Sequence, residues 1–287
     1  MTSPLARPDP SGGPRGPAPA PWDHDGLRLH VLATGSKGNA SLVETPEGII
    51  LVDCGISCRQ VIARTRACGL DPLRIRAILV THEHVDHVAG VRVTAGKLGV
   101  PVYASLATLR GARWPSEVSG TPLQARRPLE VVGVRVIPFS VPHDAPETLG
   151  FRFERAGDAI GFCTDIGHLT DEAGEYLSDA RILALESNHD VAMLSDYPGY
   201  PASLKRRIGG DDGHLSNAQA SEGLARLVTS RTQAVVGMHI SEHTNLPGVC
   251  RDALERGRDL LAPAQGRRLQ IIVAGEARPV AGIGAES

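Results

Sequence analysis

The sequence has few aromatic residues, no CxxC pair and no long apolar run. Only four Phe, four Tyr and two Trp occur among 287 residues, so the core must be mainly aliphatic and an aromatic platform for stacking bases would be small. No apolar run approaches the roughly 18–20 residues of a membrane span. The five cysteines suit a reducing cytoplasm better than a disulfide framework, and no secretory signal is expected at the N-terminus.

Charge is nearly balanced, whereas histidine is abundant. Thirty basic side chains face 32 acidic ones, giving a formal net charge of −2. A protein that coats nucleic acid by bulk charge is therefore disfavoured, and a polyanion would have to be held by a local patch. The 11 histidines outnumber all Phe, Tyr and Trp together, so histidine is the residue type that points to chemistry.

The distribution of prolines and glycines distinguishes an N-terminal tail from one folded unit. Residues 1–26 hold seven of the 21 prolines and little that a core would bury, which predicts a disordered tail. Residues 277–287 are small and glycine-containing, and a flexible C-terminal tail is expected there. Residues 27–276 alternate apolar strands with helices and contain no internal linker. This pattern predicts one α/β domain with helices on its outer faces.

Apolar runs and amphipathic patterns define the expected elements. Strands are predicted at 29–34, 40–44, 49–53, 77–81, 100–104, 131–141, 149–154, 159–164, 181–186, 234–238 and 269–273. Helices are predicted at 58–68, 85–98, 216–228 and 249–261. Polar residues follow several of these strands, which is where α/β proteins usually place their sites.

Three histidines and an aspartate directly follow the predicted strand 77–81. In the segment Thr-His-Glu-His-Val-Asp-His, an extended chain points His82 and His84 to one side, while Asp86 and His87 begin the next turn. These side chains are costly to bury as ordinary core, and they form a good ligand set for Zn²⁺ and similar metals. A histidine-rich surface loop is the alternative, and the metal site is favoured over it.

Three more candidate ligands follow other predicted strands. They are His143 after the strand 131–141, Asp165 after 159–164 and His239 after 234–238. Each alone would be interpreted as a hydrogen-bonded loop residue. Together with the first cluster they make five histidines and two aspartates, which suits two metal ions sharing a water and a carboxylate.

The His-x-His-x-Asp-His pattern resembles the signature of the metallo-β-lactamase fold, a four-layer αβ/βα sandwich. Further segments extend the resemblance over residues 29–250: TGSKGN (34–39), HDA (143–145), TDIG (164–167), ESNHD (186–190), YPxxLKxRI (200–208), GHLSN (213–217) and HISEHTN (239–245). Together they resemble the YycJ/WalJ-type metal-dependent hydrolases, which are related to tRNA 3′-processing endonucleases and phosphodiesterases. The resemblance implies that fold and a hydrolytic metal site.

The resemblance also implies how the seven ligands divide between two divalent metal ions, either Zn²⁺ or Mn²⁺. One ion would be bound by His82, His84 and His143, the other by Asp86, His87 and His239, with Asp165 bridging the two. The chain departs from the family in one place, because the family usually reads HLSxENN where this sequence has HISEHTN. His243 is therefore a candidate for an additional ligand, and the surroundings of His239 are expected to differ.

Other residues near these motifs are candidates for catalysis and substrate binding. By the resemblance, His214 at the start of the predicted helix 216–228 is the general acid or a phosphate contact, and Asp86 is counted as catalytic as well as metal-binding. Lys205 and Arg207 are candidate phosphate contacts, with a solvated helix face as the alternative.

The glycine-rich turn after the first strand is a further candidate substrate contact. Its polar side chains are able to bond phosphate or the groups behind the metal ligands, with a plain hairpin turn as the alternative: Ser36, Lys37 and Asn39. By the resemblance, Glu186, Asn188 and His189 line the site, and His189 is added to the substrate contacts. For Tyr197 and Tyr200 two interpretations stay open: stacking of a base or sugar, and packing of a helix on a loop.

These motifs favour a binuclear hydrolase of phosphodiester bonds in nucleic acid, such as a 5′→3′ exonuclease on single strands. A metal-bridging hydroxide would be the nucleophile. The alternatives are a thioester or lactone hydrolase, a small-molecule phosphodiesterase of the cyclic nucleotide type, and a metal-stabilised protein without activity. We expect a cytoplasmic protein without a membrane segment. The choice of DNA or RNA, the polarity of cleavage and the oligomeric state stay open.

Overall fold

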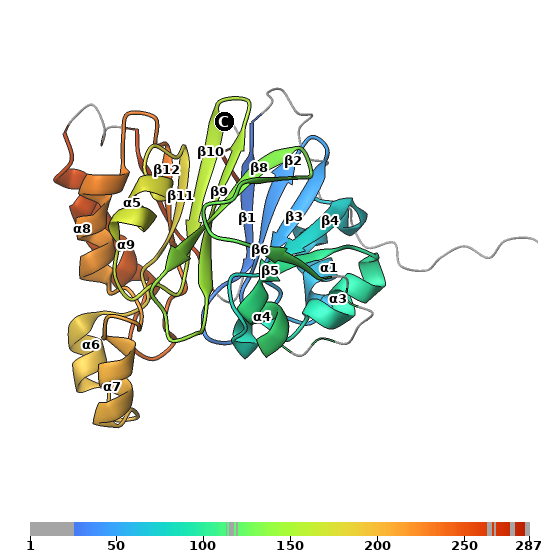
Figure 1. Ribbon diagram of the computed structural model, residues 1–287. Coiled ribbons are helices and arrows are strands. Elements are labelled where there is room, and N and C mark those ends of the chain that lie inside the picture. The colour runs from blue at the N-terminus through green and yellow to red at the C-terminus, as the bar shows by residue number, and fades with distance from the viewer. Residues whose placement is uncertain are drawn as a thin grey trace, which may run out of the picture.

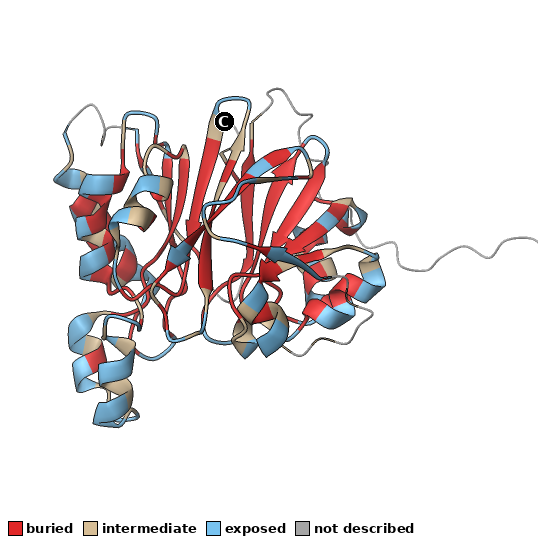
Figure 2. Ribbon diagram, in the orientation of Figure 1, coloured by how far each residue is buried: buried red, intermediate tan, exposed pale blue. Residues whose placement is uncertain are grey.

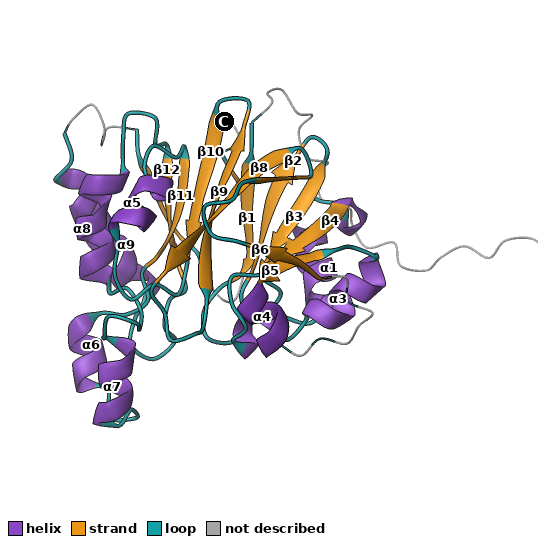
Figure 3. Ribbon diagram, viewed as in Figure 1, coloured by secondary structure: helices purple, strands orange, loops and turns teal. Residues whose placement is uncertain are grey.

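The computed structural model describes residues 26–112, 114, 118, 120–262, 266, 268–275 and 279–284. Within these residues, two seven-stranded sheets face each other and helices cover their outer faces (Figure 1; Figure 3). This is the four-layer αβ/βα sandwich that the sequence predicts. The predicted N-terminal tail, residues 1–26, lies outside the described residues except for Gly26.

The first sheet comes from the N-terminal half of the chain plus one late strand. Its order is β14 (Val280–Ile283), β1 (Arg28–Ala33), β2 (Ala40–Thr45), β3 (Gly48–Val52), β4 (Ile75–Leu79), β5 (Val102–Ser105) and β6 (Gly120–Leu123). Strands β3 to β6 run parallel. The elements that accompany this sheet are α1 (Cys58–Ala67), η1 (Pro72–Arg74), α2 (Val85–Val88), α3 (Val91–Leu98) and α4 (Leu106–Gly111).

The second sheet comes from strands that follow residue 128. Its order is β13 (Gln270–Val273), β12 (Ala234–Met238), β11 (Ile182–Glu186), β10 (Asp158–Cys163), β9 (Thr148–Arg155), β8 (Val134–Val141) and β7 (Leu129–Val131). Strands β10 to β13 run parallel. Its helices are α5 (Asp171–Leu177), α6 (Val191–Asp196), α7 (Ala202–Ile208), α8 (Asn217–Leu227) and α9 (Pro247–Asp259).

Alternating apolar side chains give the sandwich three buried layers. In β3, Ile50 and Val52 face the other sheet, where they join a cluster that contains Phe151. Ile49 and Leu51 point the opposite way, into the layer between the first sheet and its helices. A third cluster fills the space between the second sheet and α5, α8 and α9. The inner strands of both sheets are accordingly buried on both faces, whereas the edge strands β6, β7 and β14 are partly exposed (Figure 2).

The predicted helix 85–98 is two helices, α2 and α3, separated at Ala89 and Gly90. The amide of Gly90 donates to the carbonyl of Cys54, and a Cβ at this position would lie 2.0 Å from the carbonyl oxygen of Ile56. Residue 90 is therefore pressed against the loop after β3, and a single continuous helix would break this contact. The prediction of one helix is wrong for this reason.

The predicted strand 131–141 is a hairpin, because β7 ends at Val131 and β8 begins at Val134. The two residues between them, Val132 and Gly133, have φ of 53° and 68°, as the tightest hairpin turns require. The predicted flexible tail, 277–287, is also wrong over residues 280–283. These form β14, which pairs antiparallel with β1 at the edge of the first sheet.

Four short helices, α4 to α7, are absent from the sequence prediction. Each has six or seven residues, too few turns for an apolar period to be recognised. In Figure 1, α6 and α7 lie below the ends of the second sheet. No residue of α7 is fully buried, so this helix is held by its ends and by side-chain bonds rather than by a core.

Candidate metal centre

The candidate ligands leave the ends of four strands at one edge of the sandwich. The segment after β4 carries His82 to His87, and the segments after β8, β10 and β12 carry His143, Asp165 and His239. Asp165 and His239 have left-handed backbone, with φ of 57° and 54°. Such backbone costs about 1–3 kcal/mol per residue and is typical of functional sites. Both side chains reach the ligand residues that follow β4.

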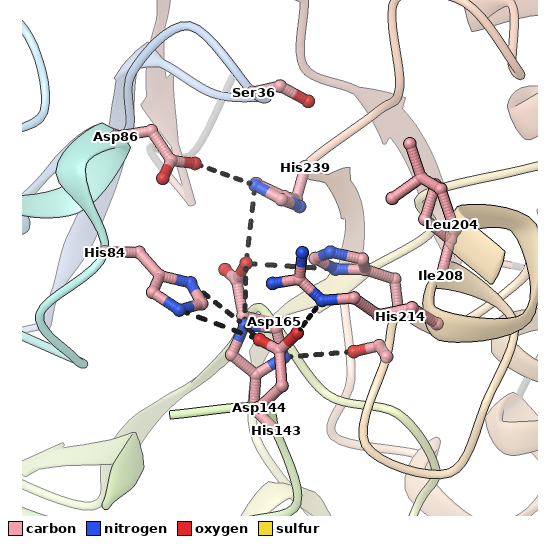
Figure 4. A pocket seen from close by; sticks show the side chains of 12 residues that line it. Ser36, His84, Asp86, His143, Asp144, Asp165, Leu204, Ile208, His214 and His239 are labelled. Atoms are coloured by element: carbon pink, nitrogen blue, oxygen red, sulfur yellow. Dashed lines mark hydrogen bonds and ion pairs between the residues drawn. The ribbon is translucent and has the colours of Figure 1, made fainter. Parts of the chain in front are cut away.

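The structure brings all seven predicted ligand residues together. The candidate ligand atoms lie within 4.8 Å of one another in each of two triads: His82, His84 and His143, and Asp86, His87 and His239. Asp165 lies between the triads. Its Oδ2 is 3.2 Å from Nε2 of His87, and its Oδ1 is 3.5 Å from Nε2 of His239 and 3.8 Å from Nε2 of His143. Figure 4 shows Asp165 centrally, below His239.

The chemistry of these atoms fits divalent metal ions. Nε2 of His82 and Nε2 of His239 are buried and have no hydrogen-bond partner among the described residues. A buried, unpaired imidazole nitrogen is costly unless something binds it. Imidazole and carboxylate groups are the donor types that Zn²⁺ and Mn²⁺ accept. The two triads therefore gather atoms of the kinds that coordinate divalent metal ions.

The aspartates are held in the ionised form that metal binding requires. Burial raises the pKa of Asp165, but the charges of His239 and His87 outweigh it and hold this pKa well below its usual value. Burial raises the pKa of Asp86, but the imidazoles of His239 and His87, which lie 3.6 and 3.5 Å from its Oδ2, outweigh this effect and hold the pKa well below its usual value. Burial lowers the pKa of His82, which keeps its imidazole neutral.

Asp53, at the end of β3, positions the first cluster. Its Oδ2 accepts a hydrogen bond from Nδ1 of His87 at 2.8 Å, and its Oδ1 accepts from the amide of Thr81 at 2.8 Å. Its backbone is left-handed, with φ of 58°. Because Nδ1 of His87 donates to a carboxylate, its Nε2 is the nitrogen that faces Asp165, 3.2 Å away. The sequence prediction does not include Asp53, although a polar residue at a strand end is the signal shared by the other site residues.

Glu186, at the end of β11, positions histidines that follow strands of the second sheet. Its Oε1 accepts from Nδ1 of His214 at 2.8 Å and from Nδ1 of His239 at 3.0 Å. Its Oε2 accepts from the amides of Ile166 and Leu215. Burial raises the pKa of Glu186, but the charge and hydrogen bond of His214 outweigh it and hold this pKa at about 2. One buried carboxylate therefore orients a candidate ligand and the candidate general acid together.

A pocket of about 200 Å³ opens above the triads. It is lined by Ser36, His84, Asp86, His143, Asp144, Asp165, Leu204, Arg207, Ile208, Gly213, His214 and His239. Helix α7 supplies one wall through Leu204, Arg207 and Ile208. Arg207 forms an ion pair with Asp144, a residue that the sequence prediction does not include. The predicted contacts Ser36 and Arg207 thus lie at the pocket with His214.

The remaining predicted contacts have partners within the fold. Asn39 is buried, its Oδ1 accepts from the amide of Gly35, and its Nδ2 lies 3.0 Å from Nε2 of His87, so it acts on the ligands rather than on a substrate. Lys205 donates to the carbonyl of Ser195 and ties α7 to α6. Lys37 pairs with Glu242.

Two histidines lie apart from the triads. His189 is buried behind the pocket, and burial lowers its pKa to about 4. His243, the candidate for an additional ligand, belongs to none of the ligand groups found among the described residues. Its ring stacks on Tyr197 with ring centroids 5.2 Å apart. The expectation that His243 adds a metal ligand is therefore wrong, since the side chain turns toward α6 instead.

The fold and the site define a class of protein. Two facing mixed sheets with histidine and aspartate triads at their common edge are the metallo-β-lactamase arrangement predicted from the motifs. The family model described as a β-lactamase superfamily domain matches residues 49–240, well over half of the chain. The chain belongs to this superfamily.

Two curated relatives and one solved structure show what this chain resembles within the superfamily. The chain is 34% identical to exodeoxyribonuclease YycJ of Bacillus anthracis over 79% of this chain and 87% of that protein. It is 32% identical to exodeoxyribonuclease WalJ of Streptococcus pneumoniae over 77% of this chain and 84% of that protein. The solved metallo-β-lactamase fold protein YhfI of Bacillus subtilis matches with a TM-score of 0.63 at 14% identity, over 88% of this chain and 99% of that chain. Among the described residues, no helix is long and apolar enough to cross a membrane.

Proposed function

We propose that the protein is a binuclear metal-dependent exonuclease that hydrolyses phosphodiester bonds of single-stranded nucleic acid. One observation carries this proposal: two ligand triads joined by Asp165 form the floor of a pocket that also presents His214 and Arg207. The relatives named exodeoxyribonucleases support DNA as the substrate.

The two triads would each hold one divalent ion. His82, His84 and His143 are the ligands we assign to one, and Asp86, His87 and His239 those we assign to the other, with Asp165 shared. Two ions at such a site polarise a phosphodiester and lower the pKa of a bound water. The protein supplies the orientation: Asp53 fixes the ring of His87, and Glu186 fixes the ring of His239.

His214 is the residue we assign to protonation of the leaving oxygen. Its Nδ1 donates to the ionised Glu186, so its Nε2 is the atom that can exchange a proton with a substrate. Burial lowers the pKa of His214, but the charge and hydrogen bond of Glu186 outweigh it and raise this pKa above its usual value. The Glu186 contact also holds the ring in one orientation within the pocket.

The pocket lining favours a phosphodiester over an acyl substrate. Arg207 is a cation that is able to contact a non-bridging phosphate oxygen, and its partner Asp144 lies 3.7 Å from His84. Leu204 and Ile208 are the apolar side chains in a lining that is otherwise polar, charged or glycine. A thioester or lactone hydrolase would be expected to present a larger apolar surface for the acyl chain.

Metal analysis combined with a nuclease assay tests the proposal. The purified protein is assayed for Zn²⁺ and Mn²⁺ and is then incubated with 5′-phosphorylated single-stranded DNA, the matching RNA, bis(p-nitrophenyl) phosphate and an acyl-glutathione. We expect two ions per chain, with processive loss of single-stranded DNA that the double variant Asp86→Ala/His87→Ala abolishes. Fewer than one ion per chain, or equal nuclease activity in that variant, would overturn the proposal. Turnover of acyl-glutathione alone would favour the thioesterase.

We also propose a cytoplasmic location. All five cysteines are unpaired, and four of them are buried. Thiols persist in this state in reducing compartments. Fractionation of cells that produce the protein, followed by immunodetection, tests this, and recovery in an oxidising compartment would contradict it.

A further inference from the structure

Three aromatic rings gather on the loops beside the pocket. The rings of Tyr197 and His243 are stacked, with centroids 5.2 Å apart and planes 11° from parallel. Tyr200 meets both edge-on, at 4.7 Å from Tyr197 and 5.9 Å from His243. His243 is exposed, and both tyrosines are half-buried. We call Tyr197, Tyr200 and His243 the ring cluster.

The ring cluster differs from every other described Phe, Tyr and Trp. Those other side chains all pack against one of the three apolar layers: Phe139, Phe151, Phe153, Phe162, Tyr103, Tyr176 and Trp114. Tyr197 and Tyr200 belong to none of these layers. In a chain with so few aromatic side chains, placing two of them in a surface connector needs an explanation other than core packing.

The connector between α6 and α7 is folded tightly around the first ring. At Gly199, a Cβ would lie 2.6 Å from Cε1 of Tyr197, so a residue with a side chain would displace the ring. The loop that bears His243 is also fixed, because the carbonyl of Thr244 accepts from the amide of Asp190 and the hydroxyl of Thr244 bonds Ser241. The rings are therefore held in place before any ligand arrives.

The ring cluster is continuous with the rim of the pocket. Glu242, beside His243, forms an ion pair with Lys37, whose neighbour Ser36 lines the pocket. On the other side, the connector leads directly into α7, whose Leu204 and Arg207 line the same pocket. Short stretches of chain therefore connect the ring cluster to two sides of the pocket that a phosphate of the substrate would enter.

We propose that Tyr197, Tyr200 and His243 form a stacking platform for an unpaired base of the single-stranded DNA substrate. The proposal rests on the proposed exonuclease function. His243 stacks on Tyr197 and is an exposed residue, so a base can reach it from solvent. Stacking of this kind accepts any base, because every base has a π face, and an exonuclease that removes successive nucleotides needs that tolerance.

Binding of a phosphorothioate-linked, fluorescent single-stranded oligodeoxynucleotide tests the platform, because the linkage resists hydrolysis. We expect His243→Ala and Tyr197→Leu each to weaken binding about ten-fold, the loss of one stacked base. His243→Phe keeps a planar ring and should restore binding to within about two-fold of wild type. His168→Ala removes an exposed histidine outside the ring cluster and should leave binding unchanged. Turnover of an oligomer of abasic deoxyribose phosphates, which carries no aromatic ring, should be unaffected in all four variants.

A second arm locates the stacked base. A series of oligodeoxynucleotides, each with one abasic position, is bound to wild type and to His243→Ala. At the position whose base stacks, the losses of binding free energy from removing the base and from removing the ring should not add, because each change deletes the same contact. At every other position the two losses should add.

The outcomes separate the platform from the exonuclease. If wild type cleaves single-stranded DNA but the variants bind it equally well, the platform is wrong and the exonuclease stands. If wild type neither binds nor cleaves single-stranded DNA, both proposals are wrong. A lowered melting temperature with unchanged binding would show that the rings only pack the connector against the loop, which also overturns the platform.

Discussion

The two halves of the molecule build the candidate metal centre in different ways. The first sheet contributes four ligand residues from one short segment, His82–His87, directly after β4. The second sheet contributes three, from separate strand ends after β8, β10 and β12. Each half adds one buried carboxylate, Asp53 or Glu186, that binds Nδ1 of a ligand histidine. Half of the centre is therefore local in sequence, and the other half exists only when the second sheet is assembled.

The difference extends to what each carboxylate controls. Asp53 binds Thr81 and His87, both in or next to the ligand segment. Glu186 binds groups from three segments that are distant in the chain, at Ile166, Leu215 and His239. A substitution of Asp53 would disturb only the segment that carries the first ligands. A substitution of Glu186 would disturb a candidate ligand, the candidate proton donor and two loops at once.

The largest expected effect comes from Asp165, where the two halves meet. Asp165→Ala should remove metal from both triads and lower phosphodiesterase turnover by about 1000-fold, because the carboxylate lies within 3.8 Å of histidines from both. Metal content per chain and turnover of bis(p-nitrophenyl) phosphate measure this. Asp171→Ala, which changes an exposed aspartate on α5, is the matched control. Full metal content in Asp165→Ala would contradict the shared role.

Substitutions of the two positioning carboxylates, Asp53 and Glu186, should differ in their effect on kcat. Asp53→Asn is expected to weaken metal binding by about 10–100-fold, because only His87 loses its carboxylate partner. Glu186→Gln should match that loss and also lower kcat at saturating metal, since His214 loses its partner too. Metal titration measures the loss of metal affinity, and steady-state kinetics at saturating metal measures the loss of kcat. If kcat at saturating metal falls equally in both variants, the proposed asymmetry between the halves is wrong.

Helix α7 places a candidate substrate contact, Arg207, in the second half of the molecule. Arg207→Ala should raise KM for single-stranded DNA about five-fold and leave kcat nearly unchanged, because an exposed charge-assisted contact contributes about 1 kcal/mol. Arg206→Ala, which removes the same charge one residue earlier and outside the pocket lining, should leave KM unchanged. An equal rise in both variants would indicate bulk charge rather than a specific contact.

The smallest effect on activity is expected at Glu44, a buried carboxylate of the first half that does not serve the site. Burial raises its pKa, but hydrogen bonds and charges from His30 and Arg74 outweigh it and hold this pKa below its usual value. The ionised carboxylate therefore stabilises the fold above the unfolded-state pKa of about 4.3, and this contribution is lost as the pH falls through that value toward the folded-state pKa.

Glu44→Gln should lower the free energy of unfolding by about 2 kcal/mol at pH 7 and leave metal content unchanged. Denaturant unfolding of both proteins from pH 7 down to pH 3 checks this. The difference between wild type and variant should shrink at the acidic end, and a difference that grows there would contradict the sign.

The sequence predicted the sandwich and the family because its signals are local. The continuous apolar run Ile49–Val52 places side chains on both faces of a strand. The ligand residues of the first half lie within six positions after the predicted strand 77–81. The relatives confirm the family. The structure places the seven predicted ligand residues side by side, and their binding of metal stays a prediction.

Other features could not be recognised because their cause is tertiary. Gly90 interrupts the predicted helix 85–98 since it touches the loop after β3, more than thirty residues earlier in the chain. Residues 280–283 form a strand because β1 presents an open edge to them. Asn39 was expected at the substrate, yet it is drawn inward by Gly35 and His87.

Residue type and apolar period indicate which side chains can do chemistry and which strands they follow, because both signals act over a few positions. Which of these side chains meet depends on the packing of the whole fold. The parallel order of β10, β11 and β12 brings Asp165, Glu186 and His239 to one edge, and the packing of two sheets sets them against His87. It also turned His243 away from the ligands and onto Tyr197, because a side chain's partner is fixed by the surface it packs against and not by the motif in which it stands.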